Sequence, residues 1–499
     1  MKTPEYDFLI IGAGHNGLVA AAYLAQAGRR VLVLERRQMV GGSLVSEEFG
    51  HGFRADALWP GGMLRPDIVQ DLRLALPPTA KLPFISLLPD GQRLQLDADP
   101  LQAAAAIRRF SEKDAARWPA FVQFMQRAAR FLDEIDATIM PRLPKGMSVR
   151  EGLGLAGLGL DLRRMGRRDM LRFIRMLPMT AVELLEEWFE SGPLKAALAS
   201  LAIHGVTLGP MSAGTGFTLL HNWRNRGGLA HARAGGAGAI TAALAEAAAR
   251  FGGEIRVGRG VARIQVEGCA CTGVVLEGGE EISAGAVLSA VDPKRTFLSL
   301  VHPLNLPPEF VWKTQSIKMR GSVSKLHLLT DGSHGVPEGT VVLAPSLEYL
   351  ERAYDAAKYG EISKRPYLEL TTHGNVVSIH VQFTPYALKA SNWDSRPPDL
   401  EGLVLDALKA YLPQLRSSIV DRRLLTPRDL EMTYGLTEGD LNHGQLMLDQ
   451  FLFMRPIPGW SNHRTPIENL YLCGSGVHGG GGVSGAAGRN AARVVLRAG

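Results

Sequence analysis

The chain has 499 residues, of which 46% are hydrophobic and 21% charged, so it is long enough for roughly two or three packed units and its composition excludes a disordered or fibrous protein. The net charge of +6 is spread along the sequence without interleaved aromatic residues, which argues against a nucleic-acid partner. The three cysteines make no disulfide framework, and no apolar run reaches the roughly 18 to 20 residues of a membrane span, so we expect a cytoplasmic protein. His and Cys show no metal-ligand spacing, so we expect no metal.

The first 35 residues have the pattern of a β-strand, an α-helix and a second β-strand. An apolar run at 6–11 leads into a glycine-rich loop at 12–17, and a helix-forming stretch follows at 18–26. A second β-rich run at 30–34 ends at Glu35. This order of elements predicts a βαβ unit.

The glycine-rich loop of this unit predicts a dinucleotide site. Gly12 permits the tight turn after the strand, Gly14 lets the backbone approach a pyrophosphate, and Gly17 lets the helix pack closely on the strand. The free amides and the positive end of the helix favour the anion, and His15 and Asn16 belong to the same turn. The loop fits FAD and NAD alike, because both present an ADP half.

The residues beyond the second strand extend the predicted site. Glu35 is placed to accept hydrogen bonds from an adenosine ribose, and Arg36 follows it. The pair Gly41-Gly42, followed by Ser43, offers a second turn whose backbone can pass close to the phosphates or the flavin. We expect all five residues to contact the cofactor.

The rest of the chain alternates in character. Residues 76–230 have mostly helical spacing, residues 231–300 combine a glycine turn, a helix and short strand-like runs, and residues 301–455 mix strands with helices. We predict an α/β fold in which a Rossmann-type FAD-binding domain is interleaved with a mixed α+β substrate domain. The FAD-binding domain would comprise 1–75, 231–300 and 456–499, and the substrate domain 76–230 and 301–455.

Two further glycine-rich turns precede helices. The C-terminal one, at 469–485, joins a strand-like run to a helix of small residues and makes a second site suited to an anion or to the negative charge of a reduced flavin. Its expected cofactor contacts are Gly474, Ser475, Gly482 and Val483. The other turn, at 235–238, lacks a final glycine and an acidic or arginine set for a second ribose, so we expect it to serve packing.

Together with other segments, these turns resemble the phytoene desaturase family of FAD-dependent oxidoreductases. The segments are LIIGAGHNGL at 9–18, Glu35 with Gly41-Gly42, the stretches at 235–256 and 449–460, AVDPKRTF at 290–297, and the glycine tail. The resemblance implies FAD as cofactor, with Val261 offering its backbone to the adenine. The family usually has His-Pro-Gly-Gly-Gly-Val in the tail, whereas Gly479 follows His478 here, so we expect a looser loop.

The resemblance implies hydride transfer from a substrate C–H group to the flavin. The stretch at 176–201, rich in Leu, Met and Ala, is suited either to line an apolar cavity or to form a packed helical core. We favour oxidation or desaturation of an apolar, isoprenoid-like small molecule, with oxygen or a quinone as electron acceptor. Two alternatives stay open, a flavin amine oxidase and an FAD-binding protein that acts through a protein partner without turnover.

Five side chains are candidates for catalysis. Among His204, His221, His443 and His478 we select His221 and His478 as acid or base candidates. Lys325 lies in a strand-like run with alternating apolar residues, so its ammonium either points inward and reaches a flavin edge through a water, or points outward to solvent. In flavin amine oxidases, a more distant resemblance, a lysine in a comparable strand lies near flavin N5 and assists reaction with oxygen.

Arginines and apolar residues share partly helical spacing at 161–176. This pattern indicates either peripheral contact with an anionic membrane or a solvated basic helix packed on the substrate domain. The sequence leaves both interpretations open.

Overall fold

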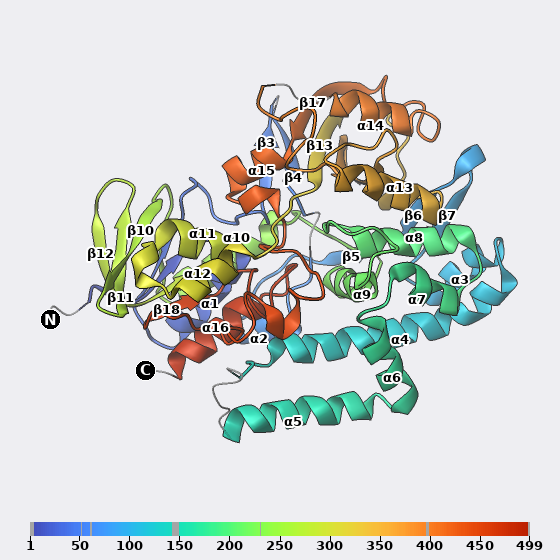
Figure 1. Ribbon diagram of the computed structural model, residues 1–499. Helices are drawn as coiled ribbons and strands as arrows, with labels where there is room; N and C mark the ends of the chain where they lie inside the picture. The colour runs from blue at the N-terminus through green and yellow to red at the C-terminus, as the bar shows by residue number, and fades with distance from the viewer. Residues whose placement is uncertain are drawn as a thin grey trace.

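Two seven-stranded sheets, covered by helices, form the centre of the molecule (Figure 1). The computed structural model describes residues 4–50, 52–59, 62–141, 149–229, 231–395 and 399–497. Each sheet takes strands from separate parts of the chain, and this confirms an α/β fold in which a Rossmann-type part is interleaved with a second, mixed part. The five domain boundaries stay a prediction.

The first sheet carries the dinucleotide loop. Its strands are β1 (Tyr6–Ile11), β2 (Val31–Leu34), β9 (Glu254–Arg256), β10 (Val261–Glu267), β11 (Ala270–Leu276), β12 (Glu281–Ser289) and β18 (Leu470–Leu472). They run in the order β10-β11-β12-β1-β2-β9, and β18 pairs with β12. β1 is parallel to both β2 and β12, so the carboxyl ends of these strands meet at one edge. Ligands bind at such an edge in open parallel sheets.

Both faces of this sheet are buried, which explains why its central strands read as continuous apolar runs. On one face, Ile10 and Val33 pack against α1 (His15–Gln26), α10 (Gly238–Arg250) and α16 (Ala486–Leu496). On the other face, Leu9 packs against Phe297 and Phe310, from the π-helical turn Thr296–Leu300 after α11 (Pro293–Arg295) and from α12 (Pro308–Gln315). Alternate residues of one strand thus serve two cores.

The second sheet has the order β17-β13-β16-β15-β14-β6-β7. Its strands are β6 (Phe84–Leu87), β7 (Arg93–Leu96), β13 (Val323–Thr330), β14 (Thr340–Leu343), β15 (Tyr367–His373), β16 (Val376–Gln382) and β17 (Ile419–Leu425). α14 (Leu400–Leu408) packs on one face through Leu400 and Val404. On the other face, Phe84 and Tyr367 join the helical core.

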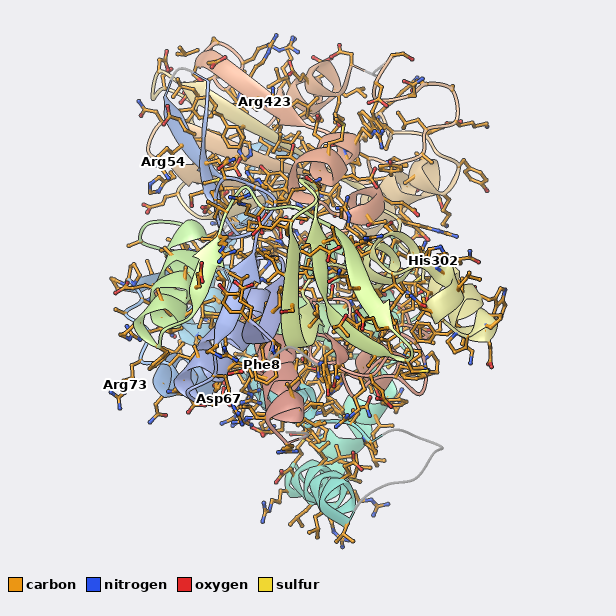
Figure 2. All side chains as sticks on the ribbon, turned by 90° about the vertical axis from the view of Figure 1, so that its left-hand side faces the viewer. Phe8, Arg54, Asp67, Arg73, His302 and Arg423 are labelled. Carbon is orange, nitrogen blue, oxygen red and sulfur yellow. The ribbon has the colours of Figure 1, made fainter. Side chains whose placement is uncertain are left out.

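A hairpin from the N-terminal segment joins the two sheets. The hairpin of β3 (Ser46–Phe49) and β4 (Phe53–Asp56) packs its phenylalanines against Val323 and Leu425 of the second sheet. Figure 2 shows Arg54 of β4 and Arg423 of β17 together in the upper part of the molecule, with Phe8 of β1 below them. α13 (Leu347–Lys358) and α15 (Pro427–Tyr434) complete this part.

The helical layer comes mainly from the middle of the chain. Its elements are α2 (Pro66–Asp71), α3 (Pro100–Arg108), α4 (Glu112–Ala137), α5 (Val149–Arg164), α6 (Arg167–Met176), α7 (Ala181–Trp188), α8 (Gly192–Ile203) and α9 (Thr215–Asn225). The short strands β5 (Thr79–Lys81) and β8 (His231–Arg233) pair beside it. The stretch at 176–201 forms a packed core with α4 and α9, as the core interpretation predicts, and it lines none of the three cavities described below.

α5 extends from the lower edge of the molecule, with α6 between it and the body (Figure 1). α6 is anchored by Phe173, whose ring lies 5.0 Å from that of Phe131, and by Asp169, which accepts a hydrogen bond from Arg127. Leu171 and Ile174 remain exposed on its outer side. Within the described ranges, no helix is both long and apolar enough to span a membrane. Peripheral membrane contact stays a prediction.

Candidate functional site

The loop between β1 and α1 brings backbone atoms close together at glycines. Gly12 has a φ of +95°, which favours glycine, and a Cβ at Gly17 would collide with the carbonyl oxygen of Gly12. A Cβ at Gly14 would meet no described atom within 4 Å, so the backbone there faces open space. The N-terminus of α1 therefore opens onto a cavity, an arrangement suited to a diphosphate.

The second predicted turn closes on the first. The N–H of Gly41 donates to the carbonyl of Ala13 at 2.9 Å, and a Cβ at Gly42 would lie 3.3 Å from the Cα of Gly14. Both turn residues have positive φ, at +125° and +61°. The two glycine turns thus form one continuous backbone wall.

Glu35 stands at the end of β2 with its carboxylate fixed. Oε2 accepts a hydrogen bond of 2.8 Å from the N–H of Ala13, and Oε1 accepts one of 2.9 Å from the N–H of Arg37. Each carboxylate oxygen has further lone pairs. The side chain is therefore oriented by the loop and still able to accept from a ribose hydroxyl.

These residues line one cavity of about 330 Å³. The predicted cofactor residues in its wall are Gly12, Gly14, His15, Asn16, Gly17, Glu35, Arg36, Gly41, Gly42, Ser43, Val261, Ser475 and Gly482. Trp59, Tyr434 and Leu441 also line it, and sequence reasoning missed them because no local pattern marks them. The N-terminal loop and the C-terminal tail thus meet in a single site.

Two predicted contacts lie outside this cavity. A Cβ at Gly474 would collide with the carbonyl oxygen of Ala290, so Gly474 permits close packing of the tail on the end of β12. Val483 lines a neighbouring, smaller cavity. Neither residue lines the main cavity, and a cofactor contact stays a prediction for both.

Two half-buried histidines of the main cavity each have a buried ring nitrogen without a partner among the described residues. Nε2 of His15 and Nδ1 of His443 make no hydrogen bond within the described part of the chain. Burial, with a contribution from His443, lowers the pKa of His15 to about 4, so its ring is neutral near pH 7. Leaving a buried polar atom unpaired costs about 1 to 3 kcal/mol. A polar ligand in the cavity is therefore expected to form a hydrogen bond with each of the two unpaired ring nitrogens. The phosphates, ribityl chain and flavin of FAD offer such groups.

The tail packs tightly, contrary to the expectation of a looser loop. Gly479, where the resembled family has proline, has a φ of +77°, which proline cannot adopt. A Cβ there would lie 2.8 Å from the carbonyl oxygen of Asp136, and one at Gly482 would collide with Asn225. The glycines therefore let this loop approach α4 and α9 closely.

The two histidine candidates are held by the scaffold. His478 is fully buried, and its Nε2 lies 3.0 and 3.1 Å from the carbonyl oxygens of Ile135 and Thr138 at the end of α4. Nε2 of His221 lies 2.9 Å from Nδ2 of Asn225, and burial lowers its pKa well below the ordinary value. Neither histidine lines the main cavity. Nε2 of each ring is held by the scaffold, whereas Nδ1 of His478 has no partner among the described residues, and an acid or base role for either histidine stays a prediction.

Lys325 points into the protein, so the solvent-facing interpretation is wrong. Its side chain is 4% exposed, and neighbouring residues of β13 are buried on both faces of the strand. Burial lowers the pKa of Lys325 to about 8, although the carboxylates of Glu369 and Asp56 oppose the change. Lys325 is therefore a buried cation at neutral pH, but it lines neither the main cavity nor its neighbour.

The turn at 235–238 has the packing role that the sequence predicts. The N–H of Ala237 donates to Oδ1 of Asp56 at 2.8 Å, and that of Gly238 donates to Oγ of Ser46 at 3.1 Å. The N-terminus of α10 is thus capped by the β3–β4 hairpin. Among the described residues, no group of three His, Cys, Asp or Glu side chains is placed to hold a metal ion.

A second cavity of about 40 Å³ adjoins the main one, and both are lined by Trp59 and Gly482. Its remaining described walls are Gly62, Met63, Thr79, His204, Asn222, Asn225, Arg226, Ala232, Arg233, Thr340 and Val483. Of these, the sequence singled out only His204 and Val483. The others come from the segment before α2, from α9 and the residue after it, and from β5, β8 and β14, which no sequence pattern connects.

A buried cluster of charges lies behind this second cavity. Nη2 of Arg226 lies 2.9 and 2.8 Å from the two carboxylate oxygens of Glu369, and Nδ1 of His204 lies 3.3 Å from one of them. Burial opposes ionisation of Glu369, but neighbouring positive charge, above all that of Arg226, outweighs it and holds its pKa well below the ordinary range. Burial also lowers the pKa of His204, so the cluster contains a carboxylate and a neutral histidine beside two cations, Arg226 and Lys325.

A dinucleotide loop, a fixed ribose-binding acid and a glycine tail around one cavity define a flavoprotein oxidoreductase of Rossmann type. The chain belongs to the flavin containing amine oxidoreductase family, whose sequence profile matches residues 17–496. It is an FAD-dependent oxidoreductase, and FAD is its cofactor.

Individual relatives agree with this family. The chain is 36% identical to pyridine nucleotide-disulfide oxidoreductase domain-containing protein 2 from Rattus norvegicus, over 99% of this chain and 94% of the relative. It is 27% identical to a limonene dehydrogenase subunit from Castellaniella defragrans, over 99% and 95%, and 25% identical to a lycopene-forming phytoene desaturase from Pantoea ananas, over 96% of each. The resemblance to the phytoene desaturases is confirmed.

Solved structures agree on the fold. An oxidoreductase from Methanosarcina mazei superposes with a TM-score of 0.60 at 17% identity, over 98% of this chain and 99% of that one. At this identity the likeness concerns the architecture alone.

Proposed function

We propose that the protein is an FAD-dependent dehydrogenase that desaturates a largely apolar, isoprenoid-like small molecule. The observation that carries the proposal is the junction of the two cavities at Trp59 and Gly482, because it gives a substrate a place beside the cofactor site. The relatives named for limonene dehydrogenase and phytoene desaturase support the substrate class, since both names refer to isoprenoid hydrocarbons.

Different residues of the main cavity hold different parts of the cofactor. The amides at Gly14 and the start of α1 bind the diphosphate, Glu35 accepts from the ribose, and the backbone of Val261 contacts the adenine. Ser475, which accepts a hydrogen bond of 3.1 Å from Asn16, fixes the tail beside α1. Bound FAD supplies a two-electron acceptor for hydride.

The reaction removes a hydride and a proton from adjacent carbons and leaves a carbon–carbon double bond. Bound FAD would accept the hydride, water would take up the proton, and oxygen or a quinone would receive the two electrons afterwards. The protein excludes bulk water and holds the substrate C–H group close to the place of the flavin, since proximity supplies much of the rate. Trp59 provides a large apolar surface for this purpose.

An amine oxidase is the alternative within the family. A protonated amine would meet Arg226 and Arg233 in the second cavity, where like charges repel and where no carboxylate occurs among the described lining residues. The same cavity also argues against a purely FAD-binding role through a protein partner, which needs no enclosed space beside the cofactor site.

Anaerobic reduction of the bound flavin tests the proposal. The FAD-loaded protein is mixed with unsaturated and saturated isoprenoids, with primary amines and with NADH and NADPH, and the loss of the flavin absorbance at about 450 nm is followed. We expect bleaching by an isoprenoid and none by amines. Bleaching by amines alone would establish the amine oxidase, and failure to bind FAD would refute the proposal altogether.

A further inference from the structure

The second cavity has a cationic wall that a hydrocarbon substrate would not use. Arg226 and Arg233 both line it, and no Asp or Glu occurs among its described lining residues. Arg226 is neutralised by Glu369, which lies behind the wall. Arg233 forms no ion pair within the described part of the chain, and its charge therefore faces the cavity without a counter-ion.

The hydrogen bonds of Arg233 leave a place for a ligand. Nη1 donates to the carbonyl oxygen of Pro77 at 2.6 Å, whereas the buried Nε has no partner among the described residues. Burial lowers the pKa of Arg233, which means that the site holds a cation at a cost. A ligand anion would satisfy the open donor and offset that cost.

The polar neighbours suit a small anion. Thr79 and Thr340 line the same space and add hydroxyl groups. Asn222 and Asn225 also line it, but Nδ2 of Asn222 already donates to the carbonyl groups of Leu201 and His204, and Nδ2 of Asn225 lies 2.9 Å from Nε2 of His221. His204 is neutral, because burial lowers its pKa. A volume of about 40 Å³ accommodates a group the size of two or three waters, so it takes the end of a molecule rather than a whole substrate.

A third cavity provides room for the rest of that molecule. It has about 380 Å³, lies between α4 and α9, and shares Met63 and Asn225 with the second cavity. Leu64, Ala129 and Trp223 contribute apolar surface to it, and Arg65, Arg130, Asp133 and Arg224 also belong to its wall. The neighbouring cavities, which share lining residues, thus place a cationic wall beside a larger space with apolar surface.

We infer that the substrate is an apolar molecule with a carboxylate at one end, and that Arg233 binds this carboxylate in the second cavity with Arg226 beside it. The inference rests on the proposed function and narrows its substrate class from a hydrocarbon to an acid. A carboxylate accepts charge-assisted hydrogen bonds in the plane of a guanidinium, whereas an alcohol of the same length leaves the charge of Arg233 uncompensated.

Calorimetric titration of the FAD-loaded protein tests the inference without turnover. Octanoate, octan-1-ol, octylamine and octyl phosphate are titrated at about pH 7.5, where the acid is ionised and the amine protonated. We expect octanoate to bind roughly 10- to 100-fold more tightly than octan-1-ol, the range of hydrogen bonds to charged groups, and octylamine to bind most weakly. Equal affinity for the acid and the alcohol would overturn the inference, and stronger binding of octyl phosphate would replace the carboxylate with a phosphate ester.

Variants of Arg233 test whether the preference for octanoate arises in the second cavity. Arg233→Gln should abolish the preference for octanoate over octan-1-ol, Arg233→Lys should retain part of it, and Arg416→Gln, in an exposed pair with Asp406, should leave it unchanged. A full preference in Arg233→Gln would refute the role of this residue. The absorbance of bound FAD reports whether each variant is folded, and the wild-type comparison decides the substrate class even if Arg233→Gln fails to fold. If the protein binds FAD but prefers octan-1-ol, only this inference is refuted. If it binds no FAD, the proposed function is refuted.

Discussion

Nη2 of Arg226 donates to both carboxylate oxygens of Glu369, at 2.9 and 2.8 Å, although the Glu369 side chain is only 3% exposed. Removing one partner of a buried pair leaves an uncompensated charge, which costs far more than the loss of an exposed pair. The pair therefore links the stability of the second sheet to the wall of the second cavity.

Glu369→Gln should lower the free energy of unfolding by about 3 kcal/mol at pH 7, because the buried charges of Arg226 and Lys325 then lose the compensating carboxylate of Glu369. Chemical denaturation followed by circular dichroism measures the change. Asp406→Asn, which removes only the exposed pair with Arg416, is the matched control and should leave stability nearly unchanged. Equal effects of the two substitutions would contradict the role of the buried pair.

The same pair should make stability depend on acid pH. The pKa of Glu369 is lowered in the folded protein, so its contribution is fully present above the ordinary value of about 4.3 and is lost as the pH falls through the folded value. The difference in stability between the wild type and Glu369→Gln should therefore persist from pH 7 to pH 5 and shrink only in stronger acid. Denaturation midpoints measured across this range test the sign.

Gly14→Val should abolish FAD binding without unfolding the protein. The added side chain meets no described protein atom at its Cβ and extends into the space in front of α1, where the diphosphate binds. We expect a colourless variant with a normal circular dichroism spectrum. The control is Gly157→Val, at another glycine where a Cβ would meet nothing, on the exposed side of α5, and it should stay yellow. A yellow Gly14→Val protein would contradict the assignment of this loop.

Lys325→Met should stabilise the protein at neutral pH, by on the order of 2 kcal/mol. Because burial lowers the pKa of Lys325 to about 8, the cost of the buried ammonium is fully present below about pH 8 and disappears as the pH rises toward the ordinary value of 10.5. The advantage of the variant should consequently shrink between pH 8 and pH 10. An advantage that is constant over this range would mean that charge is not its origin.

The same variant tests a catalytic role for Lys325. If this lysine assists the reaction of reduced flavin with oxygen, Lys325→Met retains FAD and substrate-dependent bleaching but is reoxidised at least tenfold more slowly. Stopped-flow mixing of the reduced protein with oxygenated buffer measures the rate. An unchanged rate would remove Lys325 from the mechanism and favour an electron acceptor other than oxygen.

His478 and His443 should behave differently when replaced. His478→Ala should lower the thermal midpoint but leave the flavin spectrum unchanged, because its ring binds the carbonyl groups of Ile135 and Thr138. His443→Ala should shift the spectrum or the reduction potential of the flavin, because this ring lines the main cavity with an unpaired nitrogen. The opposite pattern would restore His478 as the functional residue.

The sequence by itself determined the dinucleotide loop, the ribose-binding acid and the interleaved fold. These features depend on neighbours close along the chain, since the turn at Gly12 and the position of Glu35 follow from one βαβ unit of about 30 residues. The tail could also be identified, because a strand, a glycine loop and a helix follow one another directly. Its packing could not, and Gly479 shows the reason: its φ of +77° and its contact with α4 arise from tertiary structure.

Only the tertiary structure decided the orientation of Lys325 and the composition of the second cavity. The alternation of apolar residues along β13 could not predict whether Lys325 faces the interior or the solvent, because both faces of this strand are covered. Arg233 reaches the cavity from β8 and Arg226 from the end of α9, beside Thr340 of β14, more than 100 residues further along the chain. Such a wall exists only once the two sheets and the helical layer have packed together, and its charge is unbalanced because Glu369 pairs with Arg226 and leaves Arg233 to the cavity.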